Sequence, residues 1–176
     1  MEKINIYEYS GIVCPGAVFI VGLYSIVPSI YSNLEVFSFG AAVLFIIISF
    51  CVGNILQGIS NILEDFVYSP KKYTNYILKK EKIKKTRAEI IEMLTRNNKL
   101  EKLNICNRQY GLVRGMCASF LCLIFISIGT YKESTYTLIL LLLFCFSLYR
   151  AIHFMKLYTE TLCLEYKSIT NTKKGR

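Results

Sequence analysis

The stretch "AAVLFIIISFCVGNILQGISNILED", residues 41–65, decides the fold of this chain. Its first twelve residues carry no charge and a single hydroxyl, so they form one continuous apolar run. Polar side chains then follow at steps of three, four and three residues: Asn54, Gln57, Asn61 and Glu64. On a helix these steps place all four on one face. Gly53 and Gly58 lie beside them and would allow a second helix to approach closely. The sequence therefore predicts an apolar helix that ends in one polar stripe.

Three more apolar blocks accompany the one at 36–58, and they cover residues 11–30, 110–130 and 136–154. Each is close to the ~20 residues that a helix needs to cross a hydrocarbon core. A soluble helical bundle would need polar outer faces, which these blocks lack. Hydrophobic residues make up 53% of the 176 residues. We therefore predict an all-α integral membrane protein with about four apolar helices.

Two of the blocks are interrupted by residues that disfavour a regular span. The first contains Pro15 and Pro28 but no signal-peptide cleavage site, so it is predicted as a retained helix that is kinked or short. The third contains Arg114, which has to reach the membrane interface or find a partner. That span is therefore expected to start near residue 115.

The placement of the net charge of +9 predicts the topology. Residues 71–108 contain twelve Lys and Arg against four Glu, a net charge of +8, whereas the two short loops near 31–35 and 131–135 are almost uncharged. By the positive-inside rule, the middle segment and both chain ends are cytoplasmic. The predicted domains are a membrane hairpin (1–68), a basic cytoplasmic helical segment (69–109), a second membrane hairpin (110–155) and a cytoplasmic tail (156–176).

The basic segment is predicted as helical. Ser69 and Pro70 suit the first positions of a helix that runs on to about residue 96, and Asn97 and Asn98 indicate a turn. A second helix would then lead back to the membrane, and the two helices could form a cytoplasmic hairpin or extend the second and third membrane helices past the bilayer. The tail is predicted as a frayed helix with a disordered basic end.

Three roles compete for the basic face, whose main residues are Lys79, Lys80, Lys82, Lys84, Lys85 and Arg87. These residues could set the topology and attract anionic membrane lipids. They could instead dock an acidic protein partner or a sister subunit. Nucleic-acid binding would depend on charge alone, since no base-reading module is recognisable, so we do not expect direct contact with nucleic acid.

Two roles compete for the polar stripe at Asn54, Gln57, Asn61 and Glu64. The side chains could form hydrogen bonds between helices of one subunit. They could also line or gate a pore, because several subunits around an axis would convert one Asn or Gln into a ring of polar groups.

Catalysis and metal binding have little support in the sequence. Arg150 and His153 lie one helical turn apart, and His153 is the only histidine of the chain. No carboxylate pair or nucleophile–base constellation accompanies them, so we predict a protein that is not an enzyme. The seven cysteines contain no CxxC pair and lie in apolar or cytoplasmic segments, so neither disulfides nor a metal site nor another cofactor is expected.

The full chain resembles the small membrane accessory proteins of type VI-B CRISPR systems. The resemblance lies in the length, the apolar N-terminal part, the basic helical middle and the late pair in "RAIH", residues 150–153. It implies a ring-shaped homo-oligomer, an octamer, that forms a pore in the bacterial inner membrane. It also implies that the pore strengthens phage defence by depolarising the membrane together with an RNA-guided, RNA-cleaving nuclease. Some such proteins carry a degenerate HEPN-type ribonuclease motif with four to six residues between Arg and His, whereas Arg150 and His153 have two between them.

Three functional hypotheses follow. The first is a homo-oligomeric membrane pore, with the polar stripe and the Arg150–His153 pair near its inner end. The second is a membrane adaptor that recruits a cytoplasmic partner through residues 71–108. The third is a membrane-tethered HEPN-like ribonuclease, against which the short Arg–His spacing argues.

Overall fold

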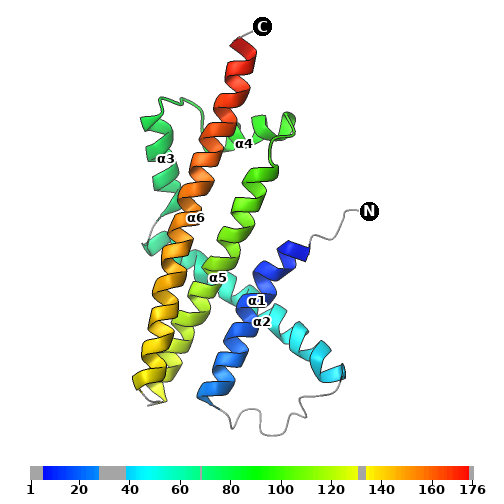
Figure 1. The fold of residues 1–176 in the computed structure, drawn as a ribbon, viewed down its shortest axis with the longest axis vertical. Helices are drawn as coiled ribbons and strands as arrows, with labels where there is room; N and C mark the ends of the chain where they lie inside the picture. The colour runs from blue at the N-terminus through cyan, green and yellow to red at the C-terminus, as the bar shows by residue number, and fades with distance from the viewer. Residues whose placement is uncertain (1–5, 28–38, 68, 131–133, 175–176) are drawn as a thin grey trace. The chain divides into compact units, whose positions relative to one another are not determined.

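The computed structural model describes residues 6–27, 39–67, 69–130 and 134–174, and each regular element in these ranges is an α-helix (Figure 1). The helices are α1 (Ile6–Ile26), α2 (Phe39–Val67), α3 (Pro70–Lys80), α4 (Arg87–Arg96), α5 (Glu101–Gly129) and α6 (Ser134–Lys174). The prediction of an all-α fold is confirmed.

Four of these helices, α1, α2, α5 and α6, are long and apolar enough to cross a membrane. Their number equals that of the predicted apolar blocks, and the chain is a multi-pass membrane protein. α1 is a single helix of 21 residues with Pro15 inside it, so the proline does not end the helix. The predicted span residues 28–30 and 36–38, most of both short loops and the two chain ends lie outside the described residues.

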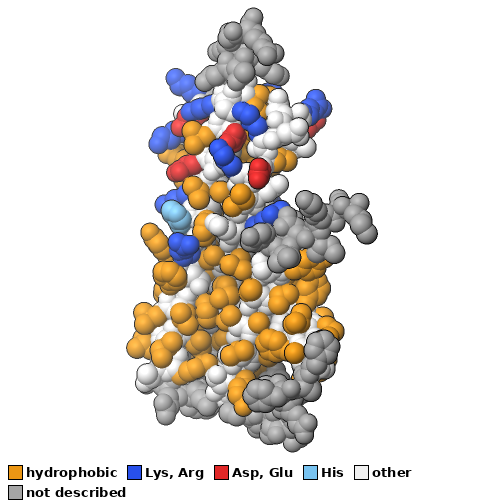
Figure 2. All heavy atoms as spheres, turned by 45° about the vertical axis from the view of Figure 1, so that its right-hand side comes forward, with side chains coloured by type: hydrophobic (Ala, Val, Ile, Leu, Met, Phe, Trp, Pro, Cys, Tyr) orange, Lys and Arg blue, Asp and Glu red, His pale blue; other side chains and the backbone are white. Residues whose placement is uncertain are grey.

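The chain divides into two compact units, and the division falls within α2, α5 and α6. The first unit comprises residues 1–63 and 111–151, so it contains most of both predicted membrane hairpins. Its core consists of side chains from α1, α5 and α6: Ile26, Phe120, Leu123, Ile124 and Leu140. Tyr136 Oη also donates a hydrogen bond of 3.3 Å to the Gly22 carbonyl oxygen. Figure 2 shows hydrophobic side chains over most of the drawn face of this unit.

Apolar exposure is most pronounced along the first half of α2. The six consecutive side chains from Val43 to Ile48 are each 39–56% exposed. An uncovered apolar helix surface is stable only against lipid or against another protein, because water would order around it at a large cost in free energy. This part of the first unit is therefore built for a membrane or a neighbouring chain.

The second unit comprises residues 64–110 and 152–176. The helices α3 and α4 pack there with the first turns of α5 and the end of α6. Their shared core includes Leu78, Ile90, Leu94, Leu103, Leu162 and Ile169. A buried pair of hydroxyls, Thr74 Oγ1 and Thr159 Oγ1, lies 3.2 Å apart within it.

This packing corrects the prediction that the tail, residues 156–176, is a frayed helix. α6 is helical as far as Lys174. The side chains of Leu162 and Ile169 on it are 0% and 4% exposed. Residues 156–170 are therefore a structural part of the second unit rather than a frayed helix. Residues 175–176 of the predicted disordered end lie outside the described residues. Composition alone suggested fraying because the stretch is polar on average, whereas its apolar residues recur at helical spacing and find a partner surface.

The single helix predicted for residues 70–96 is also corrected, since the chain forms two helices there. α3 ends when Lys82 adopts a left-handed backbone conformation, with φ 55°. The Lys82 N–H then bonds to the Lys79 carbonyl oxygen and the Ile83 N–H to that of Leu78, which is the Schellman pattern of a helix end. α4 starts with a capping box, in which the Thr86 side chain accepts from the Glu89 N–H and the Glu89 carboxylate accepts from the Thr86 N–H.

Candidate functional site

Two glycines bring α1 and α2 into direct backbone contact. A Cβ atom placed on Gly16 would lie 1.9 Å from the Ser49 carbonyl oxygen, and one on Gly53 would lie 2.0 Å from that of Ile12. No side chain fits at either position, so these glycines permit the crossing. The expectation for Gly53 is confirmed. Gly58 is different, because no described atom lies within 4 Å of a Cβ placed on it.

Beside this crossing, the Gln57 amide links three helices of the first unit. Its Nε2 donates hydrogen bonds of 2.9 Å to the Gly11 carbonyl oxygen on α1 and 3.2 Å to that of Gly111 on α5. Its Oε1 accepts one of 3.2 Å from Arg114 Nη2 and a long one of 3.5 Å from Ser60 Oγ. Both donors of the amide are therefore used. Its oxygen is held mainly by Arg114, because the single Ser60 hydroxyl hydrogen has a shorter bond of 2.8 Å to the Gln57 main-chain carbonyl oxygen.

Pro15 explains why α1 needs this amide. Proline has no N–H, so within α1 the carbonyl four residues before it, that of Gly11, loses its helical hydrogen bond. Gln57 supplies the missing donor from α2. Ser119 Oγ on α5 adds a bond of 2.9 Å to the Pro15 carbonyl oxygen. In a membrane the repair by Gln57 matters, because water is absent from the hydrocarbon core and cannot replace a lost partner.

Arg114 finds its partner within the protein. Its side chain is half-buried, and its guanidinium donates to the Gln57 amide oxygen. Sequence reasoning required a partner for this arginine but did not pair it with Gln57. The two residues are 57 positions apart, and only the packing of α2 against α5 brings them together.

The polar stripe separates into an inner and an outer part. Gln57 is half-buried among α1, α2 and α5, whereas Asn54 and Asn61 are exposed. Asn54 Nδ2 donates a bond of 2.9 Å to the Phe50 carbonyl oxygen on its own helix. Glu64 is half-buried and belongs to the second unit. The inner part forms hydrogen bonds between helices, and pore lining stays a prediction that now concerns mainly Asn54 and Asn61.

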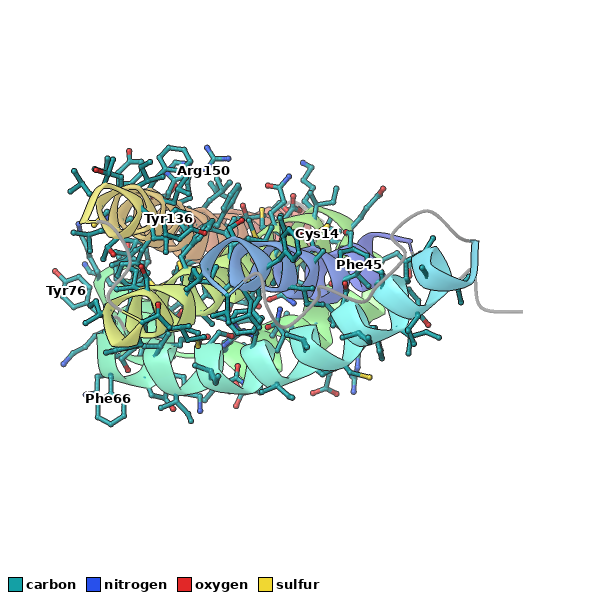
Figure 3. The ribbon with its side chains drawn as sticks, turned by 90° about the horizontal axis from the view of Figure 1, so that it is seen from below. Cys14, Phe45, Phe66, Tyr76, Tyr136 and Arg150 are labelled. Carbon is teal, nitrogen blue, oxygen red and sulfur yellow. The ribbon has the colours of Figure 1, made fainter. Side chains whose placement is uncertain are left out.

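Arg150 and His153 both lie on the surface of α6. Arg150 projects outward from the helices in Figure 3. The His153 ring lies 5.8 Å from that of Phe154 in an edge-on arrangement. Among the described residues, no three His, Cys, Asp or Glu side chains gather as metal ligands would. The proposed roles of Arg150 and His153 stay predictions.

The six basic residues that were predicted to contact a partner or lipid differ in their surroundings. Arg87 is half-buried, and its Nη2 donates a bond of 3.1 Å to Tyr158 Oη, with the guanidinium carbon 5.0 Å from the centre of that ring. Lys80 is exposed. The other four, Lys79, Lys82, Lys84 and Lys85, line one hollow at the turn between α3 and α4.

Comparison of the chain with known protein families, with curated proteins and with solved structures finds no match. Function is therefore inferred from the two sites described above, the polar face of α2 and the lysine-lined hollow.

Proposed function

We propose that this chain assembles with copies of itself into a pore in the bacterial inner membrane. The pore supports antiviral defence by depolarising that membrane together with an RNA-guided CRISPR nuclease. The depolarisation and the nuclease come from the resemblance of the whole chain to accessory proteins of type VI-B systems. The assembly and the pore are supported by the surface of α2.

One observation carries the pore, namely the exposed polar face that Asn54, Gly58 and Asn61 form on an apolar helix. The three residues are spaced four and three apart, so they share one side of α2, and all three are exposed. The Asn54 amide donates one hydrogen bond to the Phe50 carbonyl oxygen, but an amide that faces lipid leaves its remaining donor and its oxygen without partners, which costs free energy. This side of α2 is therefore expected to face water or a polar surface of another subunit.

A ring of identical subunits accounts for both kinds of surface. Around an axis, Asn54 and Asn61 of each subunit would form two polar rings, and polar rings line the constrictions of many channels. Gly58 between them has open space around it, so a neighbouring helix could approach its backbone closely. The exposed apolar residues on other sides of the first unit would face lipid. Both chain ends and the second unit would then be cytoplasmic by the positive-inside rule.

Ion flux through liposomes tests this proposal. The full chain, reconstituted at a fixed protein-to-lipid ratio, is expected to pass monovalent cations or anions and to migrate as a multimer in detergent. Asn54→Leu combined with Asn61→Leu should reduce flux towards the leak of protein-free liposomes, because both polar rings become apolar and dewet. Ile55→Leu with Ile62→Leu is the matched control, since these neighbours are 65% and 61% exposed and stay apolar.

Three outcomes would contradict the pore. They are a monomer in detergent, liposomes without flux at any membrane potential, and equal effects of the Asn and Ile pairs. In bacteria that carry the nuclease, the Asn variant should also lose membrane depolarisation and phage protection. Normal protection by that variant, together with loss of protection when Lys79, Lys80, Lys82, Lys84 and Lys85 are neutralised, would favour the adaptor instead.

A further inference from the structure

A basic hollow lies in the second unit where the chain turns from α3 into α4. It is a shallow surface depression of about 600 Å³ that is widely open to solvent. Its lining is Asn75, Leu78, Lys79, Lys82, Ile83, Lys84, Lys85 and Thr86. Half of these eight residues are lysines and none is a carboxylate. The lining is therefore rich in positive charge, and an anion placed there would be attracted to it.

The floor of the hollow is fixed by the core of the second unit. Leu78 is 4% exposed within that core, and Ile83 packs against it. Contact between these two positions is the usual accompaniment of a Schellman helix end. The Lys85 Nζ lies 2.8 Å from Met93 Sδ, so the stem of this lysine is held against α4. The lysines therefore project from a rigid base and not from a loose loop.

Lys82 occupies a backbone position at which lysine is unfavourable. Its φ of 55° lies in the left-handed region, where a Cβ atom clashes with the following carbonyl group. α4 ends in the same hydrogen-bond pattern, and there the equivalent position is Asn98, with φ 53°. Asn tolerates this conformation far better than lysine does, and Gly better still. Strain of this kind is concentrated at functional sites, where the side chain has a use that outweighs its conformational cost.

We propose that this hollow binds a small ligand that carries at least two negative charges on phosphate oxygens. Lysine is a common phosphate ligand because its ammonium group acts as a compact charge with three donors. The volume falls in the usual range for small molecules and head groups, and is small for a folded protein partner. The hollow is lined from Asn75 onward, at the end of α3 that is farther along the chain from α2. Phosphate oxygens are shared by soluble phosphate compounds and by anionic phospholipid head groups, and the two probes of the test distinguish these sources.

The test uses the full chain in a zwitterionic detergent with two probes. Calorimetric titration with inorganic pyrophosphate measures a soluble phosphate ligand, and native mass spectrometry with phosphatidylglycerol counts retained anionic lipids. Phosphatidylcholine serves as the uncharged lipid control. We expect at least one of the two anionic probes to bind. The probe that binds more tightly at equal ionic strength shows whether the phosphate ligand is a soluble compound or a lipid head group.

Variants distinguish this site from a generally basic surface. Lys79→Gln with Lys84→Gln should weaken binding on the order of tenfold, because two lining charges are removed. Lys71→Gln with Lys72→Gln removes the same charge from exposed positions on α3 that do not line the hollow, and should change binding less than about twofold.

Lys82→Gly distinguishes the loss of a ligand contact from a loss of binding that is caused by unfolding. It removes one lining ammonium but also relieves the left-handed strain, so the unfolding temperature should rise while affinity falls. The proposal is overturned if neither anionic probe binds to the wild-type chain. It is also overturned if the Lys71/Lys72 pair weakens binding as much as the Lys79/Lys84 pair, or if Lys82→Gly binds as tightly as wild type. None of these results bears on ion flux, so failure here leaves the pore proposal intact.

Discussion

Gln57 shows how one amide can determine the packing of three helices. Periodicity placed it on the same face as Asn54, Asn61 and Glu64, and that placement is correct for a helix. The four residues nevertheless differ in exposure, because Gln57 meets the backbones of α1 and α5 while Asn54 and Asn61 do not. Which side chains of the stripe are buried depends on Gly11 and Gly111, which are 46 and 54 positions away from Gln57 in the sequence. Helical spacing within α2 carries no information about these two residues.

Replacing Gln57 by Leu should destabilise the first unit by about 1–3 kcal/mol, because the Gly11 carbonyl and the Arg114 guanidinium both lose a partner. Pro15→Ala restores an N–H on α1 that can bond to the Gly11 carbonyl. In that background Gln57→Leu should cost about 1 kcal/mol less. Thermal unfolding of the four proteins of this double-mutant cycle, in one detergent, measures the difference. Strictly additive effects would show that Gln57 does not replace the proline's missing donor.

Glu81 gives a prediction for the dependence on pH. The Lys167 ammonium pairs with its carboxylate and lowers the pKa of Glu81 below its ordinary value of 4.5. A lowered pKa contributes stability that is present above the ordinary value and is lost as the pH falls through the lowered one. Glu81→Gln should therefore unfold at a slightly lower temperature than wild type at pH 7, and the difference should vanish well below pH 4.5. The effect is small because both groups are exposed.

Glu160→Gln on α6 is the matched control for this measurement, since Glu160 is also an exposed carboxylate of the second unit. A difference between wild type and Glu81→Gln that persists unchanged at pH 3 would exclude the ion pair as its cause.

Two of the three glycines of α2, Gly53 and Gly58, lie five residues apart and have opposite surroundings. The sequence pattern predicts the same role for Gly53 and Gly58, because both accompany the stripe. The structure presses Gly53 against the backbone of α1 and leaves Gly58 open. Only the crossing point of a second helix distinguishes them, and that point is set by Gly16 on α1.

Gly53→Ala should therefore be severe and Gly58→Ala mild in a monomer. A methyl group on Gly53 forces the backbones of α1 and α2 apart, at a cost of several kcal/mol by analogy with overpacked cores. We expect loss of folded protein from detergent extracts, measured by size-exclusion chromatography. Gly58→Ala should retain a normal yield and normal helix content. If it also shifts the elution towards smaller assemblies, Gly58 lies at the contact between subunits.

Across the whole molecule, the sequence was most informative about where the apolar helices lie in the chain. It was least informative about which helices pack against each other. Long runs without charge predicted four membrane-length helices because a bilayer demands such runs. The break between α3 and α4 was missed because it depends on Lys82, a residue type that normally continues a helix. The packing of the tail was missed because its partners, such as Leu78 and Leu94, lie some 70–90 positions earlier. Subunit number and pore function stay predictions.

The repair of α1 by Gln57 also has a consequence for biosynthesis. As the chain leaves the ribosome, α1 is made before α2, with the Gly11 carbonyl still unmatched because of Pro15. Its donor emerges 46 residues later with α2, and the Gly111 carbonyl that shares this donor follows after another 54 residues. The early helices are therefore incomplete intermediates during insertion. The Gln57 amide acquires its bonds to Gly111 and Arg114 only after α5 has been made, so a nascent chain that stops after α2 is an expected substrate for membrane quality control.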